Sequence, residues 1–139
     1  MNSILITTDF SPHSQYTLEY VLNLLEQTRV TSRILLVNTY LMDLQNDPQG
    51  LVQRNDELKL LSNNHLDKQK AESLRWIRNP EITIQTASHM GSLPNVISHL
   101  IIKEKIDLVA MGNDGGSHVY KIVDLLKKLK CPLLITYQK

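Results

Sequence analysis

The stretch Ile4-Leu5-Ile6-Thr7-Thr8-Asp9-Phe10-Ser11-Pro12 decides the fold of this chain. Three consecutive aliphatic residues followed by threonines are typical of a short strand that is buried on both faces. Ser11 is a good helix cap, and Pro12 suits the first helical position because the N–H group that proline lacks would have no partner there. The stretch therefore predicts a strand, an acid at its carboxyl end and a helix directly after it.

Outward from this stretch, hydrophobic periodicity predicts an alternation of helices and strands. Helices are expected at about residues 12–27 and 51–77, and two more are expected to begin after Gly91 and after Ser117. Further strands are expected at residues 34–37, 82–86, 107–111 and 133–137. Strict alternation implies an α/β fold with a parallel sheet covered by helices on both faces. The length of 139 residues fits a single domain over residues 1–139.

The second predicted helix, residues 51–77, has a weak apolar stripe. Asn63-Asn64 is poor helix material and predicts a kink or a frayed turn. Trp76 stands between two arginines, and a core anchor is favoured over a side chain that stacks on a nucleic-acid base. Residues 41–50 are rich in turn formers and predict a polar loop before the helix. The stripe consists of Leu58, Leu61, His65, Leu66, Leu74 and Ile77.

Composition excludes several classes of function. The formal net charge is +1 and no basic run is long, so binding to nucleic acid is not expected. A single cysteine excludes an internal disulfide framework and a multi-cysteine zinc site, and no metal site is expected. No apolar run is long enough for a membrane span. The first residues form a core strand rather than a cleavable leader, so the cytoplasm is the expected location.

Several short motifs, taken in order, resemble those of the universal stress protein family. They are the Thr8–Ser11 turn, Gly91 before the third helix, residues 107–112 with Gly115 beyond them, and Cys131–Ile135. The resemblance covers essentially the whole chain. It implies a five-stranded sheet in the order 3-2-1-4-5, of the Rossmann-like type found in adenine-nucleotide alpha hydrolases. In that order Asp9 and the glycine-rich turn face each other where the strand order reverses.

The resemblance also implies a candidate nucleotide site, but only half of its motif is present. Members that bind ATP carry Gly-x2-Gly-x9-Gly-Ser/Thr after the fourth strand. Gly112 and Gly115 match the first half, whereas Leu125-Leu126 stand where the second Gly-Ser pair belongs. ATP is therefore disfavoured, and no cofactor is predicted. A loop with a purely structural role is preferred to a vestigial site or a site for a smaller anion. The candidate site residues are Asp9, Gly112, Gly115, Gly116 and Ser117.

Other chemistry is sparse in the sequence. His13 and His118 stand near predicted helix starts and could flank the Asp9 cleft, although surface histidines are the favoured interpretation. Ser14 and His13 are neighbours on a helix and do not face each other, so no nucleophile–base pair is expected. Lys130 could lower the pKa of Cys131, yet an inert core thiol at the start of a buried strand is preferred.

The expected function is that of a non-enzymatic, cytoplasmic universal-stress-protein-like homodimer that acts in stress adaptation through protein contacts. The alternatives are a member that binds or slowly hydrolyses ATP with Asp9 and the Gly112–Ser117 turn, and a sensor of another small ligand in the same cleft. Residues 133–137 contain no charge, proline or glycine, although edge strands usually carry such protection. The expected dimer interface is therefore the last strand, Leu133, Leu134, Ile135, Thr136 and Tyr137. The alternative is that the C-terminal tail or the neighbouring helix shields this edge.

Overall fold

Five parallel strands form the sheet of the computed structural model, in the order β3-β2-β1-β4-β5. The structure describes residues 2–41, 48–75, 77–113 and 118–137. The fold class and the strand order predicted from the sequence are confirmed. The elements are β1 (Asn2–Thr7), α1 (Pro12–Glu26), β2 (Ser32–Tyr40), α2 (Pro48–Leu74), β3 (Ile82–Met90), α3 (Leu93–Lys103), β4 (Leu108–Gly112), α4 (His118–Leu129) and β5 (Leu133–Thr136).

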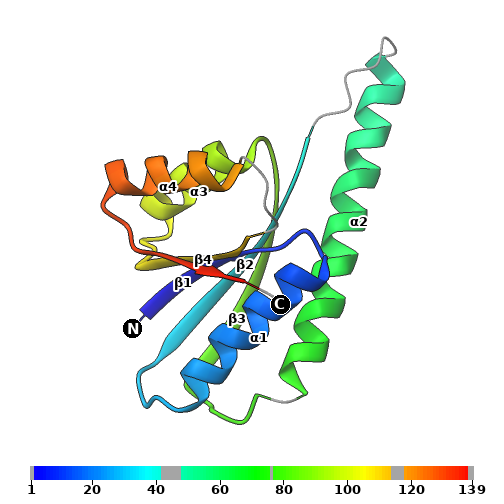
Figure 1. Cartoon of the computed structure of the whole chain (residues 1–139). Helices are drawn as coiled ribbons and strands as arrows, with labels where there is room; N and C mark the ends of the chain where they lie inside the picture. The colour runs from blue at the N-terminus through cyan, green and yellow to red at the C-terminus, as the bar shows by residue number, and fades with distance from the viewer. Residues whose placement is uncertain (1, 42–47, 76, 114–117, 138–139) are drawn as a thin grey trace.

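The sheet lies between two pairs of helices, with α1 and α2 on one face and α3 and α4 on the other (Figure 1). Successive side chains of β1 alternate between the two cores. Ile4 and Ile6 pack in the core on the α1 side, and Leu5 packs in the core on the α3 side. All three are buried, so the predicted central strand is confirmed.

The strand order reverses between β1 and β4. β1 pairs with β2 from Asn2 to Thr7 and with β4 from Ile4 to Ile6. From the edge strand β3 the chain crosses to β4 through α3, on the face opposite to α1 (Figure 1). The carboxyl ends of β1 and β4 are therefore followed by connections that leave in different directions, which is the usual place for a ligand in such a sheet.

The predicted starts of α1 and α3 are confirmed. Ser11 caps α1 by accepting a hydrogen bond from the Ser14 N–H, and Pro12 occupies the first turn. Ser92 holds the N-cap position of α3, and its side chain makes no capping hydrogen bond. Gly91 before it has a φ of 139°, a conformation that favours glycine.

β2 and β3 are longer than predicted. They pair over nine residues, from Ser32 with Ile82 to Tyr40 with Met90, and extend past the end of β1. The predicted strand at 34–37 stopped where its aliphatic run stopped, and the one at 82–86 stopped where the alternation of apolar and polar residues stopped. The ends of both strands are only partly buried, so polar residues continue the ladder without giving a hydrophobic signal.

The buried face of α2 differs from the predicted one. Leu61 and Leu74 are 54% and 49% exposed, and His65 is exposed as well. The helix runs without interruption through Asn63-Asn64, so the predicted kink is wrong. The loop predicted at 41–50 lies mostly outside the described residues, and the helix begins at Pro48. Trp76 also lies outside them. Among residues 55–74, where the side chains of α2 are described, the buried residues are Ser62, Leu66, Gln69 and Ser73.

Replacing Leu5 with alanine should destabilise the protein by about 2–5 kcal/mol, because Leu5 is fully buried in the core between the sheet and α3. Urea unfolding followed by circular dichroism measures this free energy of unfolding.

The matched control is Ile102→Ala, which shortens an aliphatic side chain on α3 that is 71% exposed. Its free energy of unfolding should change by less than about 0.5 kcal/mol. Equal effects of the two substitutions would contradict the central position of β1.

Candidate functional site

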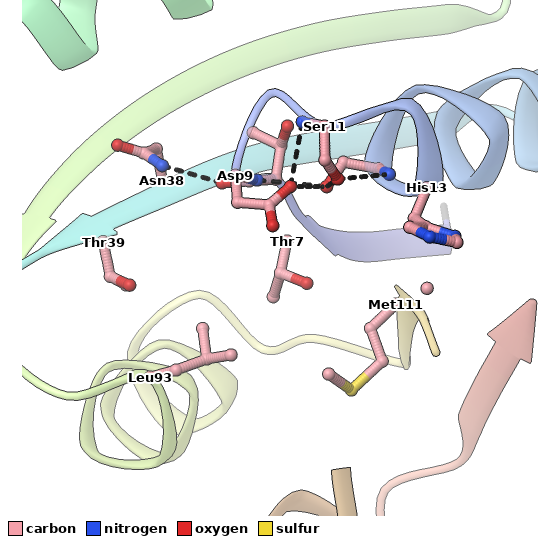
Figure 2. A pocket seen from close by; sticks show the side chains of 11 residues that line it. Thr7, Asp9, Ser11, His13, Asn38, Thr39, Leu93 and Met111 are labelled. Carbon is pink, nitrogen blue, oxygen red and sulfur yellow. Dashed lines mark hydrogen bonds between the residues drawn. The ribbon is translucent and has the colours of Figure 1, made fainter. Parts of the chain in front are cut away.

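A cavity of about 160 Å³ lies at the carboxyl ends of β1, β2 and β4, and we call it the Asp9 pocket. Figure 2 shows Asp9 between Asn38 and His13, with Leu93 of α3 and Met111 of β4 across the opening. The pocket thus occupies the point where the strand order reverses. It is lined by Thr7, Thr8, Asp9, Ser11, His13, Ser14, Asn38, Thr39, Leu93, Met111 and Gly112.

Hydrogen bonds within its own turn hold the Asp9 carboxylate in place. Asp9 Oδ1 accepts hydrogen bonds from Ser14 Oγ and, at 2.9 Å, from the Ser11 N–H. The Asp9 N–H donates to Ser14 Oγ at 3.1 Å. The second carboxylate oxygen points toward the pocket (Figure 2). One oxygen is thus used for the turn, and the other faces the space where a ligand would lie.

Two opposing effects set the pKa of Asp9. Partial burial raises the pKa of this carboxyl, while hydrogen bonds from Ser11 and Ser14 lower it. The hydrogen bonds outweigh burial, and the pKa lies below its ordinary value. Asp9 is therefore a carboxylate at neutral pH and can act only as an acceptor of hydrogen bonds.

The residue after Asp9 adopts a rare backbone conformation. Phe10 has a φ of 65°, in the left-handed region that side chains other than glycine seldom occupy. Its N–H donates to Thr8 Oγ1 at 3.0 Å, and its ring lies 4.9 Å from the His65 ring of α2. Strained residues of this kind persist where surrounding contacts hold them, and they gather at binding sites.

Gly112 lines the same pocket as Asp9. A Cβ at this position would lie 3.0 Å from Thr17 Oγ1 and 3.1 Å from the His13 carbonyl oxygen. Glycine therefore lets the end of β4 approach α1 closely. This structural role agrees with the preferred interpretation of the glycine-rich turn. The other candidate residues, Gly115, Gly116 and Ser117, lie outside the described residues.

His13 lines the pocket, so the favoured prediction of a surface histidine is wrong at this position. The side chain is only partly exposed, because α1 begins against the end of the sheet. Within the described ranges, its Nδ1 is a buried polar atom without a hydrogen-bond partner. Such atoms are uncommon in native proteins and point to a bound water or ligand. The side chain of His118 is not among those that the structure describes.

Sequence reasoning missed the contribution of β2 to the pocket. Asn38 and Thr39 follow the aliphatic run of β2, beside Thr7 and Thr8 at the end of β1. Asn38 Nδ2 donates to the Thr8 carbonyl oxygen at 2.7 Å. The signal was present in the sequence, because polar residues that end two neighbouring parallel strands meet at the same edge of a sheet.

The thiol of Cys131 is partly buried. Burial raises the pKa of the Cys131 thiol and the charge of Asp107 raises it further, so the direction opposes activation by Lys130. No group of three or more metal-ligating side chains gathers among the described residues. None of the helices in the described ranges has the length and apolar character needed to cross a bilayer.

Solved structures with the same fold come from several proteins. The hypothetical protein MJ0577 superimposes with a TM-score of 0.77 at 17% identity, and the match covers 99% of this chain and 96% of that chain. A universal stress protein family protein from Arabidopsis thaliana, solved with AMP bound, gives 0.68 at 13% identity, covering 100% and 93%. A universal stress protein in complex with cAMP gives 0.61 at 14% identity, covering 99% and 98%.

At these identities the structural similarity shows the fold alone. No curated protein matches the chain. The model of the universal stress protein family matches residues 1–136. Because this match spans nearly the whole chain, and the strand order that the resemblance implied is observed, the chain belongs to the universal stress protein family.

Proposed function

We propose that this chain is a non-enzymatic stress-adaptation protein whose Asp9 pocket takes a mononucleotide such as AMP in preference to ATP, and which acts as a homodimer through protein contacts. The proposal of this ligand rests on the Asp9 carboxylate. It is held in place by its turn, it is ionised at neutral pH, and one of its oxygens is directed into the pocket. A carboxylate in this position can accept hydrogen bonds from the hydroxyl groups of a ribose.

The size of the pocket favours a small ligand. Its volume of about 160 Å³ is below the roughly 300–1,000 Å³ of sites that enclose a drug-sized molecule. A ribose with part of its base would fill it, and the phosphate would remain at the opening. His13 and Asn38 offer polar groups on either side of Asp9 (Figure 2).

The helix after the glycine-rich turn argues against ATP. Leu125 and Leu126 stand at the positions where ATP-binding members of the family have a Gly-Ser pair, and both lie within α4. Leu126 is 2% exposed and packs in the core on the α3 side. A phosphate-binding loop at these two positions would require the core to open. The relatives solved with AMP and with cAMP hold mononucleotides, which agrees with a smaller ligand.

The contacts around Asp9 do not form a nucleophile–base pair. The Ser14 hydroxyl donates to the Asp9 carboxylate, so its proton is already used. His13 Nδ1 has no hydrogen-bond partner among the described residues and thus does not receive a proton from Ser11 or Ser14 there. A role in binding rather than in hydrolysis is the simpler interpretation of this arrangement.

The proposed dimer rests on the exposed edge of β5. The strand pairs with β4, which places it at an edge of the sheet as predicted, and Leu133–Thr136 contains no charge, proline or glycine. Apolar side chains on both faces of this edge line two grooves. The groove on the α4 face has about 420 Å³ and includes Val123, Leu126, Leu133 and Ile135. The groove on the α1 face has about 230 Å³ and includes Tyr16, Tyr20, Leu134 and Tyr137.

Two of the proposed interface residues contribute in different ways. Thr136 is buried and engaged in its own chain, because its hydroxyl lies 2.7 Å from Thr17 Oγ1 and its carbonyl oxygen accepts a hydrogen bond of 2.9 Å from the Asn113 N–H. Tyr137 follows the strand and is 64% exposed. A second copy that pairs with β5 about a two-fold axis would cover both the strand edge and the grooves.

Calorimetric titration should show that AMP binds more tightly than Mg·ATP, for which we expect no dissociation constant below about 1 mM. Asp9→Asn should weaken AMP binding about tenfold, because it removes a charged acceptor while leaving an oxygen for the hydrogen bonds of the turn.

The control is Asp107→Asn, which removes an acid next to the other end of β4, where Asp107 accepts a hydrogen bond from the Ser3 N–H. AMP binding should be unchanged in this variant. Micromolar binding of Mg·ATP that is lost in Asp9→Asn would overturn the preference for AMP, and AMP binding insensitive to Asp9→Asn would exclude the Asp9 pocket.

Light scattering after size exclusion should give twice the 15.9 kDa chain mass for the unmodified protein. Ile135→Pro should give a smaller species or an aggregate, since proline removes a backbone donor and its ring disrupts a paired strand.

Ile102→Asp is the matched surface control, because Ile102 is exposed on α3. It should leave the mass of the dimer unchanged. A monomer of the unmodified protein at concentrations on the order of tens of micromolar would refute the dimer, since an edge that needs covering should pair in that range.

A further inference from the structure

The inner face of α2 is largely polar, which is unusual for a helix that packs on a sheet. Among the described side chains of α2, residues 55–74, four are buried, of which Leu66 is aliphatic and Ser62, Gln69 and Ser73 are polar. Ser62 and Gln69 are 4% and 6% exposed. Buried polar groups need hydrogen-bond partners, so the partners of these side chains decide where α2 can lie.

Gln69 connects α2 to the turn that carries Asp9. Its Oε1 accepts a hydrogen bond of 3.1 Å from Thr8 Oγ1. The same Thr8 hydroxyl accepts the N–H of Phe10, the residue with the left-handed backbone. Gln69 Nε2 donates to Gln15 Oε1 of α1 at 2.9 Å. Gln69 therefore links α2 to the turn before α1 and to α1 itself.

Ser62 connects α2 to the same turn from the other side. Its hydroxyl donates to Asn38 Oδ1 at 2.7 Å, and Asn38 Nδ2 donates to the Thr8 carbonyl oxygen at 2.7 Å. The Asn38 amide is thereby oriented at both of its ends. Because Asn38 and Thr8 both line the Asp9 pocket, two of the polar residues on the inner face of α2 contact its wall.

A third contact from α2 supports the strained residue. The His65 ring lies 4.9 Å from the Phe10 ring, with the two planes inclined at 34°. Ser62, His65 and Gln69 lie three and four residues apart, so they stand on neighbouring positions of the helix surface. All three approach the segment from Thr8 to Phe10, directly or through Asn38, and Asp9 is in the middle of that segment.

We propose that α2 braces the turn that carries Asp9, with Ser62 and Gln69 as positioning residues, so that the docking of α2 on the sheet and the occupancy of the Asp9 pocket stabilise each other. The brace itself rests on contacts within the free protein. The coupling to a ligand rests in addition on the proposed binding of AMP. By thermodynamic linkage, a ligand that binds more tightly to the braced turn also stabilises the docked position of α2. Loosening of α2 then weakens binding of the ligand.

The structure offers a matched control for this proposal. Ser73 is fully buried on the same face of α2, but its hydroxyl donates to the Gln69 carbonyl oxygen of its own helix at 2.9 Å. Ser73→Ala therefore removes a buried hydroxyl from α2 without removing a hydrogen bond to the turn. A general effect of substituting the inner face of α2 would appear in Ser73→Ala, whereas an effect of the brace would not.

The first experiment measures amide hydrogen exchange by NMR in the free protein, at the N–H groups of Phe10 and Ser11. Both donate within the turn, to Thr8 Oγ1 and Asp9 Oδ1. Ser62→Ala and Gln69→Ala should each speed exchange at these two amides about three- to tenfold, the effect of losing one hydrogen bond. Ser73→Ala should leave them as in the unmodified protein. Unchanged exchange in both Ser62→Ala and Gln69→Ala, or the same acceleration in Ser73→Ala, would overturn the brace.

The second experiment adds AMP to the same four proteins. In the unmodified protein and in Ser73→Ala, AMP should slow amide exchange across residues 62–73 of α2. None of these residues lines the pocket, so slower exchange there would not come from direct contact with AMP. Ser62→Ala and Gln69→Ala should weaken AMP binding about three- to tenfold. AMP that binds without slowing exchange in α2 would overturn the coupling. If AMP does not bind to the unmodified protein, the proposed function fails, and the first experiment still decides whether α2 braces the turn.

Discussion

The rest of the structure depends on the burial of β1 on both of its faces. Ile4 and Ile6 belong to one core and Leu5 to the other, so the first strand joins the two layers of helices to the sheet. A strand in this position has neighbours on both sides, and its carboxyl end opens between them. The turn from Thr8 to Ser11 must therefore leave the core at the point where the strand order reverses, with Asp9 exposed there.

This constraint explains why the fold and part of the site were predictable from the sequence. Unbroken aliphatic runs such as those of β1 and β2 are typical of parallel strands, and alternation with helices leaves few topologies. Once the strand order followed from the family resemblance, Asp9 and Gly112 had to face each other. The ends of β2 and β3 could not be found in this way, because their polar residues are paired in the ladder but give no hydrophobic pattern.

The wrong prediction of the buried face of α2 has a different physical origin. Hydrophobic periodicity identifies a helix face that is buried by apolar contact, and it selected Leu61 and Leu74, which are exposed. The face that is buried presents Ser62 and Gln69, whose hydrogen bonds to Asn38 and Thr8 satisfy their polar groups. A pattern of hydrophobicity contains no information about partners elsewhere in the chain, so a hydrogen-bonded interface of this kind becomes visible only in three dimensions.

The hydrogen bonds of α2 also explain how its attachment to the sheet differs from that of helices that pack through apolar faces. Hydrogen bonds are directional and depend on distance, whereas apolar contacts tolerate sliding. A helix held by Gln69 and Ser62 therefore has a defined position along the sheet. Because their partners Thr8 and Asn38 lie in the wall of the Asp9 pocket, the element that sequence patterns describe least well contacts the residues that form the site.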